Sequence, residues 1–259
     1  MKRCVEDREN MEEVVTTTQT SSALAEQGQP LKKGIYFRFG KRFLDIVCSL
    51  AVIALLWWLY LLVALLVRIK LGKGVVFTQP RPGRDEKIFL MYKFRTMTNE
   101  CDENGKLLPD DMRLTKFGKL LRSTSLDELP EVINILRGDM SIIGPRPQLV
   151  RDMVFMTERQ CKRHMVRPGL SGLAQVNGRN GISWEEKLEW DLKYIQNITF
   201  WGDLKIVLQT VFKAFDRQEG ITDGIAATAE DFGDYLLHQK LVDEEEYEKK
   251  QEEARKLLR

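Results

Sequence analysis

An uninterrupted apolar stretch near the start of the chain limits its possible folds more than any other feature. Ile46–Val67 is 22 residues long and carries no charged side chain. As a single helix it would be about 33 Å long, enough to cross the hydrocarbon core of a bilayer. Buried helices of soluble proteins are rarely apolar on every side over this length. The stretch therefore predicts a helix that enters a membrane.

The residues beside and within this stretch bear on its orientation. Basic side chains flank it on both sides: Lys32, Lys33, Arg38, Lys41 and Arg42 before it, and Arg68, Lys70 and Lys73 after it. Positive flanks favour the cytoplasmic side, so we expect a re-entrant helix that dips into the membrane and returns. Trp57, Trp58 and Tyr60 near the middle fit a plain span poorly, because Trp and Tyr prefer membrane interfaces. A spanning helix is the alternative.

Composition narrows the class of protein further. The 259 residues include 40 Lys and Arg against 38 Asp and Glu, a balance that argues against nucleic-acid binding. Cys4, Cys48, Cys101 and Cys161 have no paired spacing, which argues against a disulfide framework and a zinc site. Only two histidines occur, so a multi-histidine metal site is excluded. Any metal is expected to be a hard cation such as Mg²⁺.

Hydrophobic periodicity and turn residues divide the chain into four expected segments. They are a disordered N-terminal tail (1–36), the membrane helix (37–74), a main domain (75–217) and a charged helical C-terminal extension (218–259). Within them we expect strands at Val75–Thr78 and Lys87–Met97, and helices at Arg113–Leu121, Gln148–His164, Trp184–Gln196 (capped by Ser183), Ile198–Phe215 and Glu230–Arg259. The predicted class is a membrane-associated α/β fold with a small sheet and several amphipathic helices at the membrane interface.

The stretch Arg122–Pro147 concentrates groups that could carry chemistry. Asp127 and Glu128 are adjacent at a predicted helix start, where Ser125 and Glu128 fit a capping box and Pro130 suits the first turn. A helix start also favours bound anions such as phosphate. The simplest interpretation is that both carboxylates only cap the helix.

Nearby cations favour a catalytic interpretation instead. Arg122 precedes the pair, and Arg146 follows in a rigid Gly-Pro turn. Guanidinium groups bind phosphate in a bidentate fork. One carboxylate could attack phosphorus while the other holds a divalent cation, which indicates phosphoryl transfer. A glycine-rich segment, Val166–Asn180, adds Arg179 as a candidate substrate-binding residue, although ordinary loops share this composition.

Six blocks, taken together and in order, resemble the bacterial sugar transferases, the monotopic phosphoglycosyl transferase family. The resemblance runs from Lys41 to about Phe215 and is carried by KRFLDI, FTQPRPG, YKFRTM, RSTSLDELPEVINILRGDMSIIGPRP, VRPGLSGLAQVNGRN and WGDLKI. It implies transfer of a phosphosugar from a UDP-sugar to polyprenol (undecaprenyl) phosphate, with release of UMP. It places this first step of surface-glycan assembly on the cytoplasmic face of the bacterial inner membrane.

The resemblance also implies roles for individual residues. Asp127 would attack the β-phosphate and become an aspartyl-phosphosugar, while Glu128, together with Asp127, would hold Mg²⁺. The remaining family positions would bind or support the substrate; they are Lys93, Arg122, Pro145, Arg146, Asp191 and Asp203. The chain departs from the family in its membrane helix, which usually breaks at a Ser-Pro pair. Trp57-Trp58 stands there instead, and no proline occurs between Phe43 and Thr78, which puts the re-entrant geometry in doubt.

Two other functions fit the same residues. A nucleotide-sugar hydrolase would use water as the acceptor, and a non-catalytic membrane scaffold would use the carboxylates only as caps. The sequence does not distinguish N-acetylated amino sugars, glucose and galactose as the transferred sugar, and it leaves open whether the protein is a homo-oligomer.

Overall fold

The computed structural model describes residues 34–178, 181–215 and 230–258. They belong to one compact unit, which spans Lys33–Arg259. Almost all of the predicted tail over 1–36 lies outside the described residues, and so does Arg179. The division into four segments therefore stays a prediction.

The apolar stretch forms one long helix, as predicted. A π-helical turn, η1 (Tyr36–Gly40), leads directly into α2 (Lys41–Leu71). Together they make a helix that is long and apolar enough to cross a membrane, and only 11% of its most apolar window is buried. A buried core helix is thereby excluded. The choice between re-entry and spanning stays a prediction.

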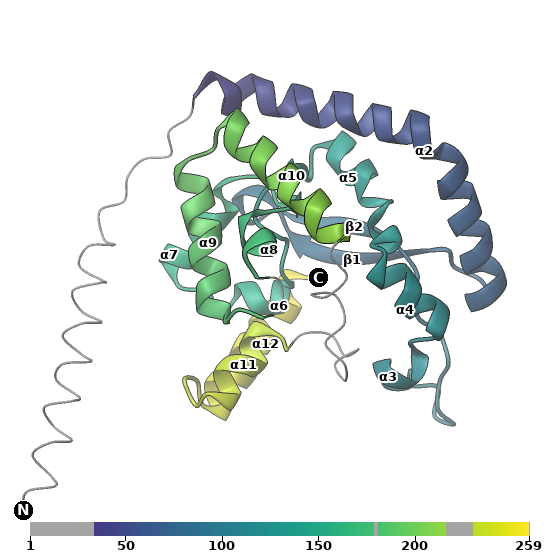
Figure 1. Ribbon diagram of the computed structural model, residues 1–259. Coiled ribbons are helices and arrows are strands. Elements are labelled where there is room, and N and C mark those ends of the chain that lie inside the picture. The colour runs from purple at the N-terminus through teal and green to yellow at the C-terminus, as the bar shows by residue number, and fades with distance from the viewer. Residues whose placement is uncertain (1–33, 179–180, 216–229, 259) are drawn as a thin grey trace, which may run out of the picture. The chain divides into compact units, whose positions relative to one another are not determined.

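Figure 1 shows that α2 bends partway along its length, although it contains no proline. The indole N–H of Trp58 donates a hydrogen bond to the backbone carbonyl of Leu55 (3.1 Å). Side chains that insert into the backbone hydrogen-bond ladder are one cause of bends in proline-free helices. Beyond Trp58, the helix packs against strand β2 and helix α4 in an apolar cluster made of Val63, Val67, Leu71, Phe94 and Leu121.

The strands form two small sheets. β1 (Val76–Pro82) and β2 (Ile88–Phe94) are antiparallel, with Val76 opposite Phe94 and Pro82 opposite Ile88. The predicted strand Val75–Thr78 was therefore too short. Prolines are tolerated here because β1 pairs with β2 alone in its sheet. β3 (Ser141–Ile143) and β4 (Gly169–Ser171) pair in parallel and form the second sheet.

Helices surround these sheets. In chain order they are η2 (Arg84–Glu86), α3 (Asp110–Arg113), α4 (Lys116–Ser123), η3 (Leu126–Glu128), α5 (Glu131–Arg137), α6 (Val150–Met153), α7 (Glu158–Cys161), η4 (Lys162–Met165), α8 (Leu173–Asn177), α9 (Trp184–Gln196), α10 (Phe200–Phe215), α11 (Phe232–His238) and α12 (Glu244–Leu257). Helix α9 has the predicted bounds, and the Ser183 hydroxyl accepts a hydrogen bond from the Glu186 amide (3.2 Å) as expected.

Two helices that were predicted to be continuous are interrupted in the structure. Gln148–His164 is divided among α6, α7 and η4, because Thr157 caps a new helix by accepting from the Gln160 amide (3.3 Å). Glu230–Arg259 is divided between α11 and α12, because Lys240 adopts a left-handed backbone and Asp243 caps α12. Local capping thus interrupts runs that look continuous in composition.

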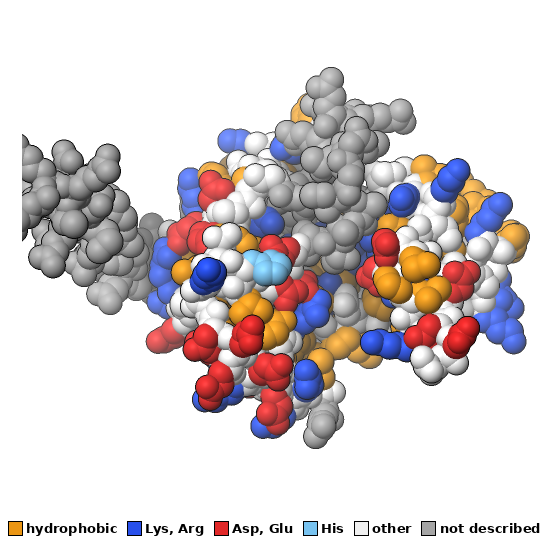
Figure 2. All heavy atoms as spheres, turned by 90° about the horizontal axis from the view of Figure 1, so that it is seen from below, with side chains coloured by type: hydrophobic (Ala, Val, Ile, Leu, Met, Phe, Trp, Pro, Cys, Tyr) orange, Lys and Arg blue, Asp and Glu red, His pale blue; other side chains and the backbone are white. Residues whose placement is uncertain are grey.

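Apolar and charged side chains are distributed unequally over the surface. Large apolar side chains are exposed on α2 and α10, where Trp201 and Phe212 are 75% and 72% exposed. Figure 2 views the unit from below, away from the first part of α2, and shows charged side chains of both signs intermixed there. Such a charged face is typical of a water-exposed surface. The exposed apolar side chains on α2 and α10 need another explanation.

Candidate active site

The Asp127–Glu128 pair lies in the short 3₁₀ turn η3, just before α5. The predicted capping box is wrong: Ser125 has a left-handed backbone (φ 55°), and its side chain makes no capping hydrogen bond. Helix α5 begins only at Glu131, after Pro130. The N-cap residue of α5 is thus Pro130, and neither carboxylate of the Asp127–Glu128 pair holds that position.

Cations from two other segments converge on Glu128. Lys93 on β2 donates to Glu128 Oε1 (2.8 Å), and the Arg146 guanidinium donates to the same oxygen (2.7 Å). Lys93 also lies 3.2 Å from Oε1 of Glu131. The structure thus brings together Lys93, Glu128 and Arg146, three of the residues that the sequence indicated. Their roles stay predictions.

The neighbouring charges drive the pKa values of two carboxyl groups apart. Burial opposes ionisation of Glu128, but the positive charges of Arg146 and Lys93 outweigh it and lower its pKa to about 2. Burial raises the pKa of Glu131 to about 7 despite Lys93, and the charge of Glu128 adds to the rise. Glu128 is therefore charged, while Glu131 holds a proton up to near neutral pH.

Asp127 occupies a drier environment than a surface carboxylate. Its residue is 8% exposed, and burial raises its pKa, with Lys93 and Arg122 acting in the opposite direction. Arg122 comes from α4 and also donates to the Thr96 hydroxyl (3.1 Å). A poorly solvated carboxylate flanked by cations is suited to act as a nucleophile toward an anionic group.

A buried ion pair supports the turn that carries Arg146. Arg163 is 1% exposed and donates to the backbone carbonyl of Arg146 (2.6 Å). It also donates through Nε and Nη2 to Asp191 on α9 (2.9 and 2.6 Å). Asp191 was predicted among the substrate-binding residues, together with Pro145, the residue before Arg146. Among the described residues, Asp191 hydrogen-bonds to Arg163. It therefore contacts the residue that supports Arg146 and not the Asp127–Glu128 pair itself.

Asp203 lies at a junction of helices. It accepts hydrogen bonds from Tyr36 (2.7 Å), Lys41 (2.6 Å) and Tyr194 (2.9 Å). These residues come from η1, α2 and α9, so Asp203 ties α10 to the start of the apolar helix. Its described contacts are structural ones, and its predicted part in substrate binding stays a prediction, as does that of Arg179.

Sequence reasoning missed three residues around the site. Glu131 shares Lys93 with Glu128, and its position three residues further along a helical turn could have indicated this. Asn134 is fully buried and joins α5 to β2, accepting from the Tyr92 amide (3.0 Å) and donating to the Leu90 carbonyl (2.7 Å). Arg163 gave no signal, because it lies in a segment where charged residues are common.

The acidic groups have the chemistry that Mg²⁺ requires. Asp127, Glu128 and Glu131 offer hard carboxylate oxygens, the donors that Mg²⁺ takes along with substrate phosphates. Glu131 Oε1 is buried, and its contact among the described residues is the Lys93 ammonium, 3.2 Å away. Burial raises the pKa of both Asp127 and Glu131, the negative charge of Glu128 raises it further, and a bound cation would offset that charge. The residues therefore fit a magnesium site.

Comparisons with known proteins identify the family of the chain. The profile of the bacterial sugar transferase family matches residues 36–217. An uncharacterized sugar transferase of Bacillus subtilis (strain 168), EpsL, is 47% identical over 192 residues, covering 74% of this chain and 95% of EpsL. A UDP-glucose:undecaprenyl-phosphate glucose-1-phosphate transferase of Klebsiella pneumoniae is 41% identical over 185 residues, covering 68% of this chain and 40% of that protein.

A third relative is named for a different sugar. It is a UDP-N-acetylgalactosamine-undecaprenyl-phosphate N-acetylgalactosaminephosphotransferase of Aeromonas hydrophila, 38% identical over 193 residues, which are 71% of this chain and 45% of the relative. The chain thus spans less than half of the Klebsiella and Aeromonas proteins. The family match includes the segments that carry Lys93, the Asp127–Glu128 pair, Arg146 and Asp191. The chain belongs to the bacterial sugar transferase family.

Proposed function

We propose that this chain transfers a phosphosugar from a UDP-sugar to undecaprenyl phosphate, the first membrane-bound step in assembly of a surface glycan. The observation that carries the proposal is a buried carboxylate, Asp127, adjacent to a Glu128 that Lys93 and Arg146 hold in place. The names of the Klebsiella and Aeromonas relatives support the two substrate classes. They name different sugars, so the sugar itself is left open.

The reaction would proceed by two displacements at one phosphorus. An oxygen of Asp127 bonds to the β-phosphorus, the bond to the bridging oxygen breaks, and UMP leaves with that oxygen. An oxygen of undecaprenyl phosphate then attacks the same phosphorus, which frees Asp127 and yields a polyprenol-diphosphate sugar. Lys93, Arg122 and Arg146 offset the negative charge that gathers around the transferred group.

Mg²⁺ is the cofactor we propose. Asp127 and Glu128 would hold it, and when bound it would neutralise charge on the diphosphate. Lys93 and Arg146 already attract one oxygen of Glu128, which fixes the direction in which that carboxylate points.

The proposed setting is the cytoplasmic face of the inner membrane. The exposed apolar side chains of α2 and α10, Trp57, Trp58, Trp201 and Phe212 among them, suit burial in a lipid layer. A re-entrant α2 would keep both ends of the helix on the cytoplasmic side. A Cys4-only variant in intact cells should then resist a membrane-impermeant maleimide, whereas ready labelling would indicate a spanning helix.

A direct assay separates this function from its alternatives. Purified chain with a panel of UDP-sugars and undecaprenyl phosphate should release UMP continuously with one sugar donor, and Asp127→Asn should abolish release while circular dichroism stays unchanged. A hydrolase would release UMP continuously without the lipid acceptor. A scaffold would release none with any donor, and either result would overturn the proposal.

A further inference from the structure

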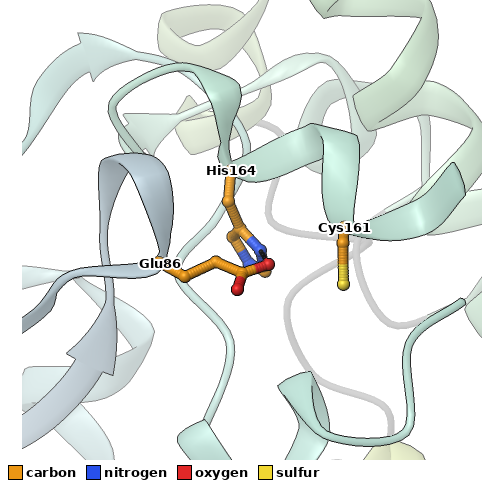
Figure 3. A group of neighbouring side chains, drawn as sticks. All are labelled: Glu86, Cys161 and His164. Carbon is orange, nitrogen blue, oxygen red and sulfur yellow. Dashed lines mark ion pairs between the residues drawn. The ribbon is translucent and has the colours of Figure 1, made fainter. Parts of the chain in front are cut away.

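A second group of metal-binding side chains lies apart from the Asp127–Glu128 pair. Glu86 in η2, Cys161 at the end of α7 and His164 in η4 lie close together, with the Glu86 and His164 side chains meeting and Cys161 beside them (Figure 3). One ligand atom from each lies within 4.8 Å of the others. Among the described residues, no other three His, Cys, Asp or Glu side chains have ligand atoms this close together. The segments that carry them are 75 residues apart in sequence, so the fold itself brings them together.

His164 gives the strongest indication of a missing ligand. The residue is 6% exposed, and neither ring nitrogen makes a hydrogen bond among the described residues. An oxygen of Glu86 lies 3.5 Å from Nδ1. Burying an imidazole without partners for its nitrogens is costly, and such groups in native proteins usually have a partner or a bound ion.

The three donors together select a class of metal. A thiolate, an imidazole and a carboxylate suit Zn²⁺ and Co²⁺ rather than Mg²⁺, which prefers oxygen ligands alone. Three protein ligands leave a fourth position of a tetrahedral site for water. Glu86 is half exposed, which gives an ion a path from solvent.

We propose that Glu86, Cys161 and His164 form a binding site for a zinc-class transition metal. Ligand atoms around tetrahedral zinc are roughly 3.3–3.8 Å apart, given its bond lengths. The separation of His164 Nδ1 and the Glu86 oxygen already falls in that range. The two separations that involve Cys161 Sγ are at most 4.8 Å, so side-chain shifts of about 1 Å would bring all three ligand atoms to tetrahedral spacing.

This site would fix the position of the turn that carries Arg146. His164 follows Arg163, whose guanidinium bonds to the Arg146 carbonyl and to Asp191. His164 also lines a small cavity together with Pro145 and Arg146. A metal joining Glu86 to η4 would therefore link the β1–β2 hairpin to Arg163, which holds the backbone carbonyl of Arg146. Its role would be structural, and it does not depend on the proposed transfer reaction.

The test uses cobalt as a spectroscopic probe. Full-length chain in detergent is stripped with EDTA and titrated with Co²⁺ in excess Mg²⁺, which occupies the carboxylates of the Asp127–Glu128 site. A variant in which Cys4, Cys48 and Cys101 are serine leaves Cys161 as the one thiol. It should develop a near-ultraviolet sulfur-to-cobalt charge-transfer band that Zn²⁺ displaces. Oxygen-only sites cannot produce this band.

Matched variants identify the ligands. In that background Cys161→Ser should abolish the band, and His164→Gln and Glu86→Gln should weaken Co²⁺ binding at least about tenfold. His238→Gln, at an exposed histidine, should bind Co²⁺ as the parent does.

Zn²⁺ should raise the melting temperature of the parent but not of Cys161→Ser, provided both fold equally in EDTA. Asp127→Asn should bind Co²⁺ normally, which separates this site from the transfer reaction. Absence of the band, or its survival in Cys161→Ser, would overturn the proposal.

Discussion

Three carboxyl groups within five residues have differently shifted pKa values because their surroundings differ. Glu128 is held between Lys93 and Arg146, and their charges keep its pKa at about 2. Glu131 is more deeply buried and shares only Lys93, so its pKa is raised to about 7. Burial also raises the pKa of Asp127, while the charges of Lys93 and Arg122 act to lower it. Environment rather than residue type therefore assigns the separate parts they would play.

Replacing Glu131 should change how stability depends on pH. Its folded pKa of about 7 exceeds its ordinary value of 4.5, so the folded state binds more protons between these values. The free energy of unfolding of the wild type should therefore fall as pH rises from about 4.5 to about 7. Glu131→Gln removes this titration and should be more stable than the wild type at pH 8, on the order of 1–3 kcal/mol.

Thermal unfolding across a pH series measures this effect. Glu100→Gln, at an exposed position in a loop, serves as the control and should follow the wild type. The same pH slope in Glu131→Gln and the wild type would show that Glu131 is not the group that titrates near neutral pH.

At the scale of elements, α2 is tied to the domain at two points along its length. Asp45, 3% exposed, accepts hydrogen bonds from the Ser141 hydroxyl (3.0 Å) and the Ile142 amide (2.9 Å) on β3. Tyr60 donates to the Leu129 carbonyl (2.8 Å), next to the Asp127–Glu128 pair. An apolar helix that contacts the active-site turn would hold that turn at a fixed height relative to the lipid.

Removing the Asp45 carboxylate should loosen this tether. Asp45→Ala leaves Ser141 and Ile142 without their acceptor and should cost about 2–3 kcal/mol, a fall of roughly 4–12 °C in melting temperature. Asp45→Asn keeps one oxygen acceptor and should lose less. Cys48→Ala, at an exposed site on the same helix, is the control. Equal melting temperatures for Asp45→Ala and Cys48→Ala would contradict the tether.

Elements with strong local signals were predictable, and those set by distant contacts were not. The apolar helix and α9 follow from hydrophobic pattern and the Ser183 cap. The left-handed backbone at Ser125 has no local signal, so the capping box was predicted in error. The Gly-Pro turn indicated Arg146 as a site residue, and the family resemblance added Lys93, but neither predicted that both would contact Glu128. The Arg163–Asp191 pair and the cluster around His164 depend on tertiary packing, which spacing alone does not reveal.

At the scale of the whole molecule, the C-terminal helices dock on the side of α6 and α9. Phe232 is 3% exposed and stacks against Trp184, with ring centroids 5.1 Å apart. An ion pair between Arg151 and Asp231 and a hydrogen bond from the Phe232 amide to Asp152 (2.9 Å) complete the contact. None of these residues bonds to the Asp127–Glu128 pair among the described residues, so the docking would stabilise the domain from outside the active site.

Disrupting this contact should release α11 and α12 without stopping the reaction. Phe232→Ala removes a buried aromatic side chain, a change that costs about 3–5 kcal/mol in protein cores. Hydrogen exchange should accelerate in α11 and α12, while UMP release stays near the wild-type rate. Leu241→Ala, at a residue that is 65% exposed, is the control. Loss of transfer in Phe232→Ala with the rest of the domain intact would mean that these helices support the active site.

The most direct test of the proposed mechanism is mass spectrometry of the enzyme after incubation with its UDP-sugar donor alone. Rapid acid quenching and peptide mapping should find a phosphosugar on the peptide that contains Asp127, with one UMP released per enzyme molecule. Adding undecaprenyl phosphate before the quench should remove the adduct. Normal turnover without any adduct on Asp127, under conditions that preserve acyl phosphates, would contradict the two-displacement account.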